Sequence, residues 1–165
     1  MIQNTIQEFL KKGKVKEADL IQLLEKNGAK VDEATPSQDM REHWDIKIVS
    51  ELKIDVKGLK KSQRSDQEPN ENIHWIEIKN VQGKVGWAYA TEVDYFAFET
   101  IDYWVIVKKE SLQQLVSDKC ASKETADSAR DAMYKLYSRK GRSDLMTQVK
   151  TLDLCCYADT IIKKK

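Results

Sequence analysis

The sequence predicts an α/β fold in which a central mixed β-sheet, containing an antiparallel meander, is flanked by helices. Three observations lead to this prediction: helical spacing of apolar residues near both ends of the chain, period-two alternation in three short segments, and two apolar segments after them. The chain has 165 residues, of which 41% are hydrophobic. We therefore expect a single domain over residues 1–165, with a helical segment at about 1–30 and a basic helical segment at about 110–165.

Apolar residues recur at helical spacing twice near the start of the chain, in residues 2–10 and again in residues 20–24. Asn27 and Gly28 follow the second group, and such residues commonly end a helix. A Thr-Pro pair at 35–36 then predicts the start of a further helical turn. We therefore expect a short pair of helices before the strands.

Three segments, at residues 43–48, 52–57 and 73–79, alternate between apolar and charged side chains. Side chains alternate faces along a strand, so each segment would form a strand with one apolar and one charged face. An antiparallel sheet with one face in water has the same pattern, so the alternation also fits a purely structural sheet. The charged faces carry carboxylates and lysines: Asp45 in the first strand, Asp55 and Lys57 in the second, and Glu77 and Lys79 in the third.

The first two of these strands predict a hairpin. Both apolar faces meet one core only if the connection has an odd number of residues, and a three-residue loop at residues 49–51 satisfies this condition. That loop places Asp45 directly across from Asp55, where Cβ atoms are roughly 4.5–5.5 Å apart and like charges destabilise the pair. Two opposed carboxylates favour a hard divalent cation, so we expect Mg²⁺ or Mn²⁺ as the cofactor.

This arrangement resembles the PD-(D/E)XK nuclease superfamily, whose signature is an Asp followed farther along the chain by Asp or Glu, any residue and Lys. Asp45 with Asp55-Val56-Lys57 fits that signature, and the resemblance covers residues 17–108. It implies a restriction-endonuclease-like fold and a metal-dependent endonuclease that hydrolyses phosphodiester bonds of DNA, with RNA not excluded. In that mechanism Asp45 and Asp55 hold the metal, and Lys57 orients the attacking water or stabilises charge on the phosphate.

A second set of residues fits the same signature, because Asp55 is also followed by Glu77-Ile78-Lys79. The sequence leaves open which set binds the metal. We prefer the first set because a short hairpin brings Asp45 close to Asp55. Glu77 is then expected as an additional metal ligand or a group that orients water, and Lys79 as a second phosphate contact. The resemblance also implies an acidic residue on the first helix near the metal. Glu25 is the nearest candidate, with a solvated surface role as the alternative.

Two regions rich in cations predict contact with nucleic acid. Residues 58–72 have no apolar periodicity and are expected to form a mobile loop that clamps phosphate, whereas residues 134–150 interleave cations with tyrosines. A glutamine beyond the third strand is a further candidate to position substrate or water. The candidates are Lys60, Lys61 and Arg64 in the loop, Gln82 beyond the third strand, and Lys135, Arg139, Lys140, Arg142 and Lys150 in the basic segment.

Two more strands are predicted at residues 93–99 and 102–109, and the second is apolar enough to be buried on both faces. A helix is expected from Ser111, and helical spacing of apolar residues predicts another over residues 124–140. Trp87, which precedes these strands, either stacks on a base or caps the core.

Composition restricts the class of protein. The net charge is only +1, so affinity for nucleic acid must come from a local patch. Three cysteines without framework spacing indicate reduced thiols and an intracellular protein, and no apolar run is long enough to span a membrane. We expect a soluble protein without a membrane partner, and the resemblance is compatible with a homodimer. The alternatives are an inactive nuclease-fold protein that binds nucleic acid or scaffolds a complex, and a domain that only docks protein partners.

Overall fold

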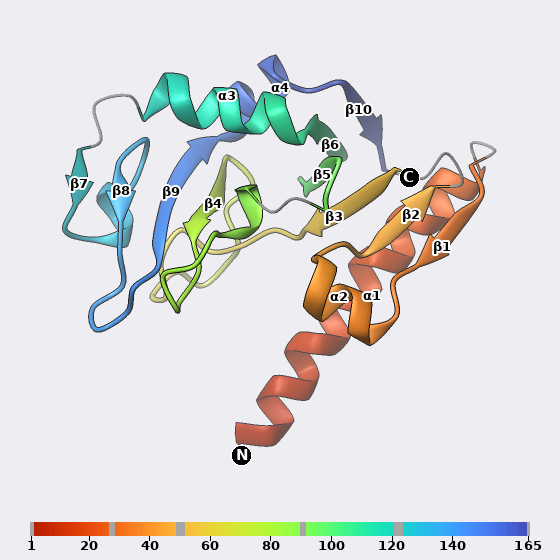
Figure 1. The fold of residues 1–165 in the computed structure, drawn as a ribbon, viewed down its shortest axis with the longest axis horizontal. Coiled ribbons are helices and arrows are strands. Elements are labelled where there is room, and N and C mark those ends of the chain that lie inside the picture. Colours follow the sequence, from red (N-terminus) through yellow and green to blue (C-terminus); the bar gives the residue numbers. More distant parts are fainter. Residues whose placement is uncertain (1, 27–28, 49–51, 90–91, 121–123, 165) are drawn as a thin grey trace.

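The computed structural model describes the backbone of residues 2–26, 29–48, 52–89, 92–120 and 124–164, and side chains from residue 14 onward. Within these residues the chain forms two mixed β-sheets and four α-helices, which confirms the α/β class (Figure 1). None of the described helices combines the length and apolar character needed to cross a membrane.

The larger sheet has six strands in the order β1-β2-β3-β5-β6-β10. All neighbours in it are antiparallel except β3 and β5, which run parallel. Its strands are β1 (Val31–Glu33), β2 (Ile46–Ile48), β3 (Lys53–Lys57), β5 (Tyr95–Glu99), β6 (Tyr103–Lys108) and β10 (Thr160–Lys163).

The smaller sheet has four strands in the order β4-β9-β8-β7. Its strands are β4 (Ile73–Lys79), β9 (Leu145–Lys150), β8 (Leu136–Tyr137) and β7 (Thr125–Ala126). The α-helices are α1 (Ile2–Lys26), α2 (Pro36–Glu42), α3 (Lys109–Lys119) and α4 (Thr151–Cys156), and two short 3-10 turns are η1 (Trp87–Tyr89) and η2 (Ala129–Asp131).

The β2–β3 hairpin has the predicted register. Ile46 pairs with Ile54 and Lys47 with Lys53, as the three-residue connection requires. The N–H of Ile48 donates to the carbonyl of Leu52 at 2.9 Å, next to the connection. Residues 49–51 themselves lie outside the described residues. The apolar faces of the two strands therefore meet the same side of the sheet, as predicted.

The antiparallel meander expected from the three alternating segments is wrong for the third segment, residues 73–79. β4 does not pair with β3 but joins the smaller sheet beside β9, and β5 lies next to β3 instead. The reason is that β5 brings a run of buried residues, Phe96, Ala97 and Phe98, to the open edge of β3. A half-charged strand could not bury as much apolar area at that position.

Both faces of the larger sheet are covered, so its charged face is not simply wet. α1 packs on one face, where Leu20 belongs to the same buried cluster as Ile46 and Ile54. The smaller sheet and α3 cover the other face in a second cluster, whose buried members include Ile76 and Leu112. Figure 1 shows α3 and α4 on one side of the molecule and α1 on the other.

The helices near the start of the chain differ from the expected pair. A single 25-residue helix, α1, runs through Gly13 and ends at Lys26, next to the predicted stop at Asn27 and Gly28, which lies outside the described residues. The second expected turn forms as α2, because Thr35 caps it and exchanges hydrogen bonds with Gln38 in a capping box.

The helix expected over residues 124–140 is also wrong, and this part of the basic segment contains β7, η2 and β8. Tyr134 has a φ of 57°, in the left-handed region, which a helix cannot contain. The carbonyl of Ala132 accepts the N–H of Gln148 at 2.9 Å, and the N–H of Tyr134 donates to the Gln148 carbonyl at 2.9 Å. Pairing with β9 thus replaces the hydrogen bonds within a helix.

The predictions for the central strands are confirmed. β5 and β6 occupy the expected segments, and β6 is buried on both faces from Trp104 to Val107. The helix expected from Ser111 begins slightly earlier, at Lys109, as α3. β5 lies beside β3 in the larger sheet, and its Phe96 and Phe98 pack against Trp87.

Candidate active site

Asp45 lies directly before β2 and is held against β3 by two hydrogen bonds. Its backbone N–H donates to the carbonyl of Ile54 at 3.0 Å, and its Oδ2 accepts the N–H of Val56 at 2.8 Å. The carboxylate of the first strand therefore reaches across to the strand that carries Asp55.

Asp55 and Lys57 lie two residues apart on one face of β3, as alternation requires. Lys57 Nζ is 2.6 Å from Asp55 Oδ1, and the two side chains are 18% and 7% exposed. The structure thus brings together the preferred set of Asp45, Asp55 and Lys57 at the junction of β2 and β3.

The two buried carboxyl groups affect each other's ionisation in opposite directions. Burial, followed by the charge of Asp55, raises the pKa of Asp45 to about 6. Burial also raises the pKa of Asp55, although the Lys57 ammonium and a hydrogen bond with Asp45 oppose this effect. A cation bound beside them would favour the charged form of both carboxyl groups.

A hard divalent cation fits this donor set. Mg²⁺ retains several of its waters and is commonly bound through one or two carboxylates. Asp45 and Asp55 supply two such groups, and burial raises the pKa of both. In the part of the chain that the structure describes, no three His, Cys, Asp or Glu side chains converge as a metal-binding group.

One carboxylate on α1, Glu17, lies within electrostatic range of Asp45, and sequence reasoning missed it. Burial, followed by the charge of Asp45, raises the pKa of Glu17, so the two side chains are electrostatic neighbours. Glu25, the candidate named from the sequence, is exposed instead. A signal was present, because Glu17 continues at helical spacing the apolar stripe of Leu20 and Leu24, which packs on the sheet.

Glu77 and Lys79 lie on β4 in the smaller sheet. Glu77 is half-buried opposite Met146, and Lys79 is exposed at the strand end, opposite Leu145. Among the described residues, neither side chain makes an ion pair or hydrogen bond with Asp45 or Asp55. The second signature set is therefore divided between two sheets.

Lys60 lies within electrostatic range of Asp55 on β3 and of Glu77 on β4. Burial, followed by the charge of Lys57, lowers the pKa of Lys60, whereas Asp55 and Glu77 raise it and Arg139 lowers it further. Its side chain is nevertheless exposed, and it has no salt bridge within the described residues. Lys60 is thus a cation beside the site that is accessible to an anion.

The other cations named from the sequence have different surroundings. Arg139 is paired with the buried carboxylate of Asp144, and Lys135 lies 3.0 Å from Glu124. Gln82 is exposed in a turn, where its N–H donates to Asn80 Oδ1 at 3.0 Å. The remaining candidates are exposed: Lys61, Arg64, Lys140, Arg142 and Lys150.

The loop at residues 58–72 is tied to the smaller sheet, contrary to the expected mobile loop. The indole N–H of Trp75 donates to the Lys61 carbonyl at 3.1 Å, and Gln148 Nε2 donates to the Ser62 carbonyl at 3.0 Å. The partners that hold the loop, Trp75 on β4 and Gln148 on β9, are distant in the sequence, so no pattern within residues 58–72 could predict these hydrogen bonds. Lys60 consequently lies directly before two anchored residues, Lys61 and Ser62.

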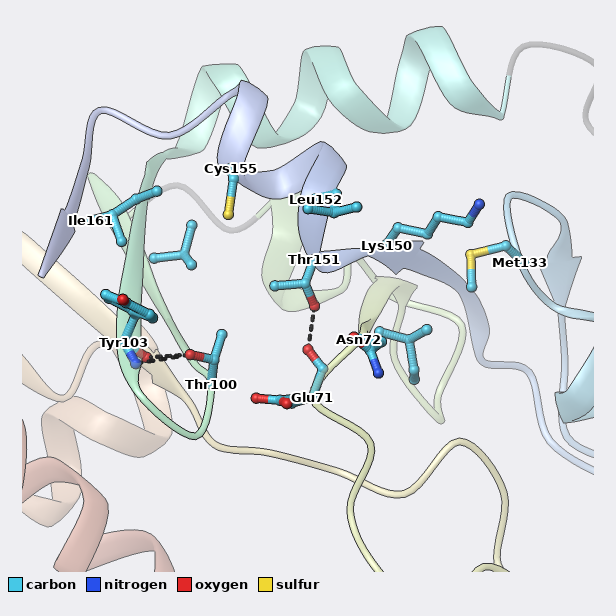
Figure 2. Close-up of a pocket in the computed structure, with 12 residues that line it drawn as sticks. Glu71, Asn72, Thr100, Tyr103, Met133, Lys150, Thr151, Leu152, Cys155 and Ile161 are labelled. Carbon is cyan, nitrogen blue, oxygen red and sulfur yellow. Dashed lines mark hydrogen bonds between the residues drawn. The ribbon is translucent and has the colours of Figure 1, made fainter. Parts of the chain in front are cut away.

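A cavity of about 550 Å³ is separate from the carboxylate pair, and Figure 2 shows the residues that line it. Mostly apolar side chains line it, among them Ile73, Leu152 and Ile161, with Lys150 also in its wall. Asp45, Asp55 and Lys57 do not line this cavity. Of the cations named from the sequence, Lys150 is therefore associated with a different part of the molecule.

Comparison with known proteins adds no family assignment. No protein-family model matches the chain, and no curated protein or solved structure is significantly similar to it. The functional inference therefore depends on the geometry of the carboxylate site.

Proposed function

We propose that this protein is a metal-dependent endonuclease that hydrolyses phosphodiester bonds of DNA, with a site of the PD-(D/E)XK type. The observation that carries the proposal is the pair of buried carboxyl groups at Asp45 and Asp55, in which burial raises the pKa of both and the charge of Asp55 raises that of Asp45 further, with Lys57 beside them. Burying two neighbouring carboxylates destabilises a fold unless a cation compensates for their charge. A catalytic metal site explains that arrangement better than a structural sheet does.

Asp45 and Asp55 would hold the divalent ion, and Glu17 on α1 is a further carboxylate within electrostatic range of Asp45. When bound, Mg²⁺ or Mn²⁺ supplies a Lewis acid for a phosphate oxygen and lowers the pKa of a bound water. Glu77 remains a proposed group for orienting water from the smaller sheet.

The lysines near this pair would act on the phosphate. The Lys57 ammonium is held beside Asp55, where it can stabilise negative charge that develops on the phosphorus centre. Lys60 would bind a neighbouring phosphate of the backbone, and Arg139 lies within its electrostatic range. Lys79 is proposed as a more distant phosphate contact on β4.

The topology supports the same proposal. The larger sheet combines the antiparallel β1-β2-β3 unit with a parallel β3–β5 pair, and helices lie on both of its faces. We propose a restriction-endonuclease-like fold on this basis. The acidic residues lie at the junction of the antiparallel unit and the parallel pair.

The test is cleavage of labelled duplex, single-stranded and branched DNA, and of RNA, with Mg²⁺, Mn²⁺ or EDTA. We expect metal-dependent products from the wild type and none from Asp45→Asn or Asp55→Asn. Asp32→Asn is the matched control, because Asp32 is an exposed aspartate on β1 of the same sheet. Full activity in either site variant would contradict the assignment.

A second candidate function is binding of nucleic acid without cleavage. The ion pair between Lys57 and Asp55 favours it, since Lys57 partly neutralises Asp55 without a metal. Such a protein would bind DNA in a salt-sensitive manner but would gain no thermal stability from Mn²⁺. A metal titration therefore separates the two candidates.

A further inference from the structure

The ammonium group of Lys57 contacts two groups. Nζ lies 2.6 Å from Asp55 Oδ1 and 4.2 Å from the centroid of the Trp87 ring. The second distance is well inside the range of a cation–π interaction, for which tryptophan is the best aromatic partner. The lysine is therefore held from one side by a carboxylate and from the other by an indole face.

The Trp87 ring is itself fixed by the core. It packs against Phe96, with ring centroids 5.1 Å apart, and against Phe98 at 6.3 Å. Both phenylalanines lie on β5, the parallel neighbour of the strand that carries Lys57. The ring thus has a defined position relative to β3. The Lys57 ammonium, which contacts the ring, is therefore held at a defined position as well.

The turn that carries Trp87 is anchored from two directions. The Gly86 N–H donates to the Ile78 carbonyl at 2.9 Å, and a Cβ at Gly86 would lie only 2.5 Å from the Glu77 carbonyl oxygen. Only glycine permits this close approach of η1 to β4. On the other side, Gln113 Nε2 from α3 donates to the Ala88 carbonyl at 3.1 Å.

We propose that Trp87 is a positioning residue that holds the Lys57 ammonium at the carboxylate site through its indole face. A lysine side chain has high rotamer entropy, so a fixed ring reduces the loss of freedom when Lys57 meets a phosphate. The ring acts independently of Asp55, so it keeps Lys57 in place when a metal ion takes up the aspartate charge. The catalytic consequence of this contact rests on the proposed nuclease function.

A tryptophan that only fills the core would behave differently. Filling the core requires apolar volume, which leucine supplies in part, whereas positioning requires an aromatic face. Trp87→Phe should therefore preserve the role, and Trp87→Leu should remove it. Tyr89→Leu is the matched control, because Tyr89 is half-buried in the same turn and packs on the same core cluster.

The first experiment is NMR of the protein with ¹³C-labelled lysine. We expect the ε-methylene protons of Lys57 upfield of their random-coil position in the wild type, assigned with Lys57→Met. The shift should disappear in Trp87→Leu and persist in Trp87→Phe and Tyr89→Leu. Lys164, which lies 4.9 Å from the Trp104 ring, provides an internal control that Trp87→Leu should leave unchanged. A Lys57 signal that Trp87→Leu leaves unchanged would overturn the proposal.

The second experiment is cleavage kinetics with the same variants, after circular dichroism has shown that they are folded. We expect Trp87→Leu to lower kcat roughly 3- to 30-fold with little change in KM, and Trp87→Phe to retain most of the activity. Equal losses in both variants would overturn the positioning role. Absence of cleavage by the wild type would instead overturn the proposed function, and the NMR result would still decide whether Trp87 holds Lys57.

Discussion

Oδ2 of Asp45 accepts the backbone N–H of Val56 at 2.8 Å, so the carboxylate before β2 is fixed to the strand that carries Asp55 and Lys57. This hydrogen bond joins two segments that the hairpin register already brings together. The result is an acidic pair in which proximity is imposed by backbone structure.

Asp45→Asn should stabilise the protein at neutral pH without metal. The pKa of Asp45 rises from 3.8 to about 6 on folding, so the native state binds the extra proton and stability falls as pH rises through this window. The loss at pH 7 is at most about 3 kcal/mol, and asparagine removes it while keeping an acceptor for Val56. Urea unfolding in EDTA should show a gain of about 1–2 kcal/mol at pH 7 and almost none at pH 4. Destabilisation at pH 7 would contradict the prediction.

His74 should make the protein sensitive to acid. Burial lowers its pKa from 6.5 to about 4, and its Nε2 is buried without a hydrogen-bond partner in the described structure. A histidine with a depressed pKa contributes stability that is present above pH 6.5 and is lost as the pH falls towards 4. The His74 and Phe98 ring centroids lie 5.1 Å apart, so His74→Leu should keep apolar contact with Phe98 while it removes the titrating group.

The expected outcome is a flatter dependence of unfolding free energy on pH in His74→Leu than in the wild type. At pH 7 the two proteins should differ by less than about 1.5 kcal/mol, because no hydrogen bond to Nε2 is lost. Denaturant unfolding at pH 7 and pH 4.5 measures this difference. Identical acid sensitivity in both proteins would show that another group titrates.

Glu17 and Glu25 offer a matched comparison on one helix. Glu17 is an electrostatic neighbour of Asp45, whereas Glu25 is exposed one residue beyond the apolar stripe. We expect Glu17→Gln to weaken Mn²⁺ binding about 10-fold and Glu25→Gln to leave it unchanged. Thermal shift in a Mn²⁺ titration provides the measurement, with Asp55→Asn as the variant that should show no stabilisation. Equal effects of the two glutamine variants would exclude Glu17 from the site.

Lys60 and its neighbour Lys61 should differ in their effect on DNA. Lys60 is within electrostatic range of Lys57 and Asp55, whereas Lys61 contributes its backbone carbonyl to Trp75 and has an exposed side chain. Lys60→Ala should lower cleavage about 10-fold and reduce the salt dependence of binding by about one counterion. Lys61→Ala should have a much smaller effect on cleavage. Binding and cleavage are to be measured between low and physiological salt. A loss of cleavage in Lys61→Ala that equals or exceeds the loss in Lys60→Ala would contradict the prediction.

The sequence predicted those parts of the molecule that depend on local pattern. Period-two alternation and the parity of a three-residue connection were sufficient for the pairing of Ile46 with Ile54, and with it the meeting of Asp45 and Asp55. A continuous apolar run was likewise sufficient for β6, which is buried on both faces.

The tertiary structure decided the features that depend on pairing between distant segments. β4 joined β9 because β5 occupies the edge of β3, and residues 124–140 paired with strands although their spacing is helical. Glu17 came within electrostatic range of Asp45 because α1 packs on the larger sheet, and Trp87 reached Lys57 because η1 is held between β4 and α3. These contacts depend on which apolar surfaces bury one another, and that choice is made over the whole chain and not within any one segment.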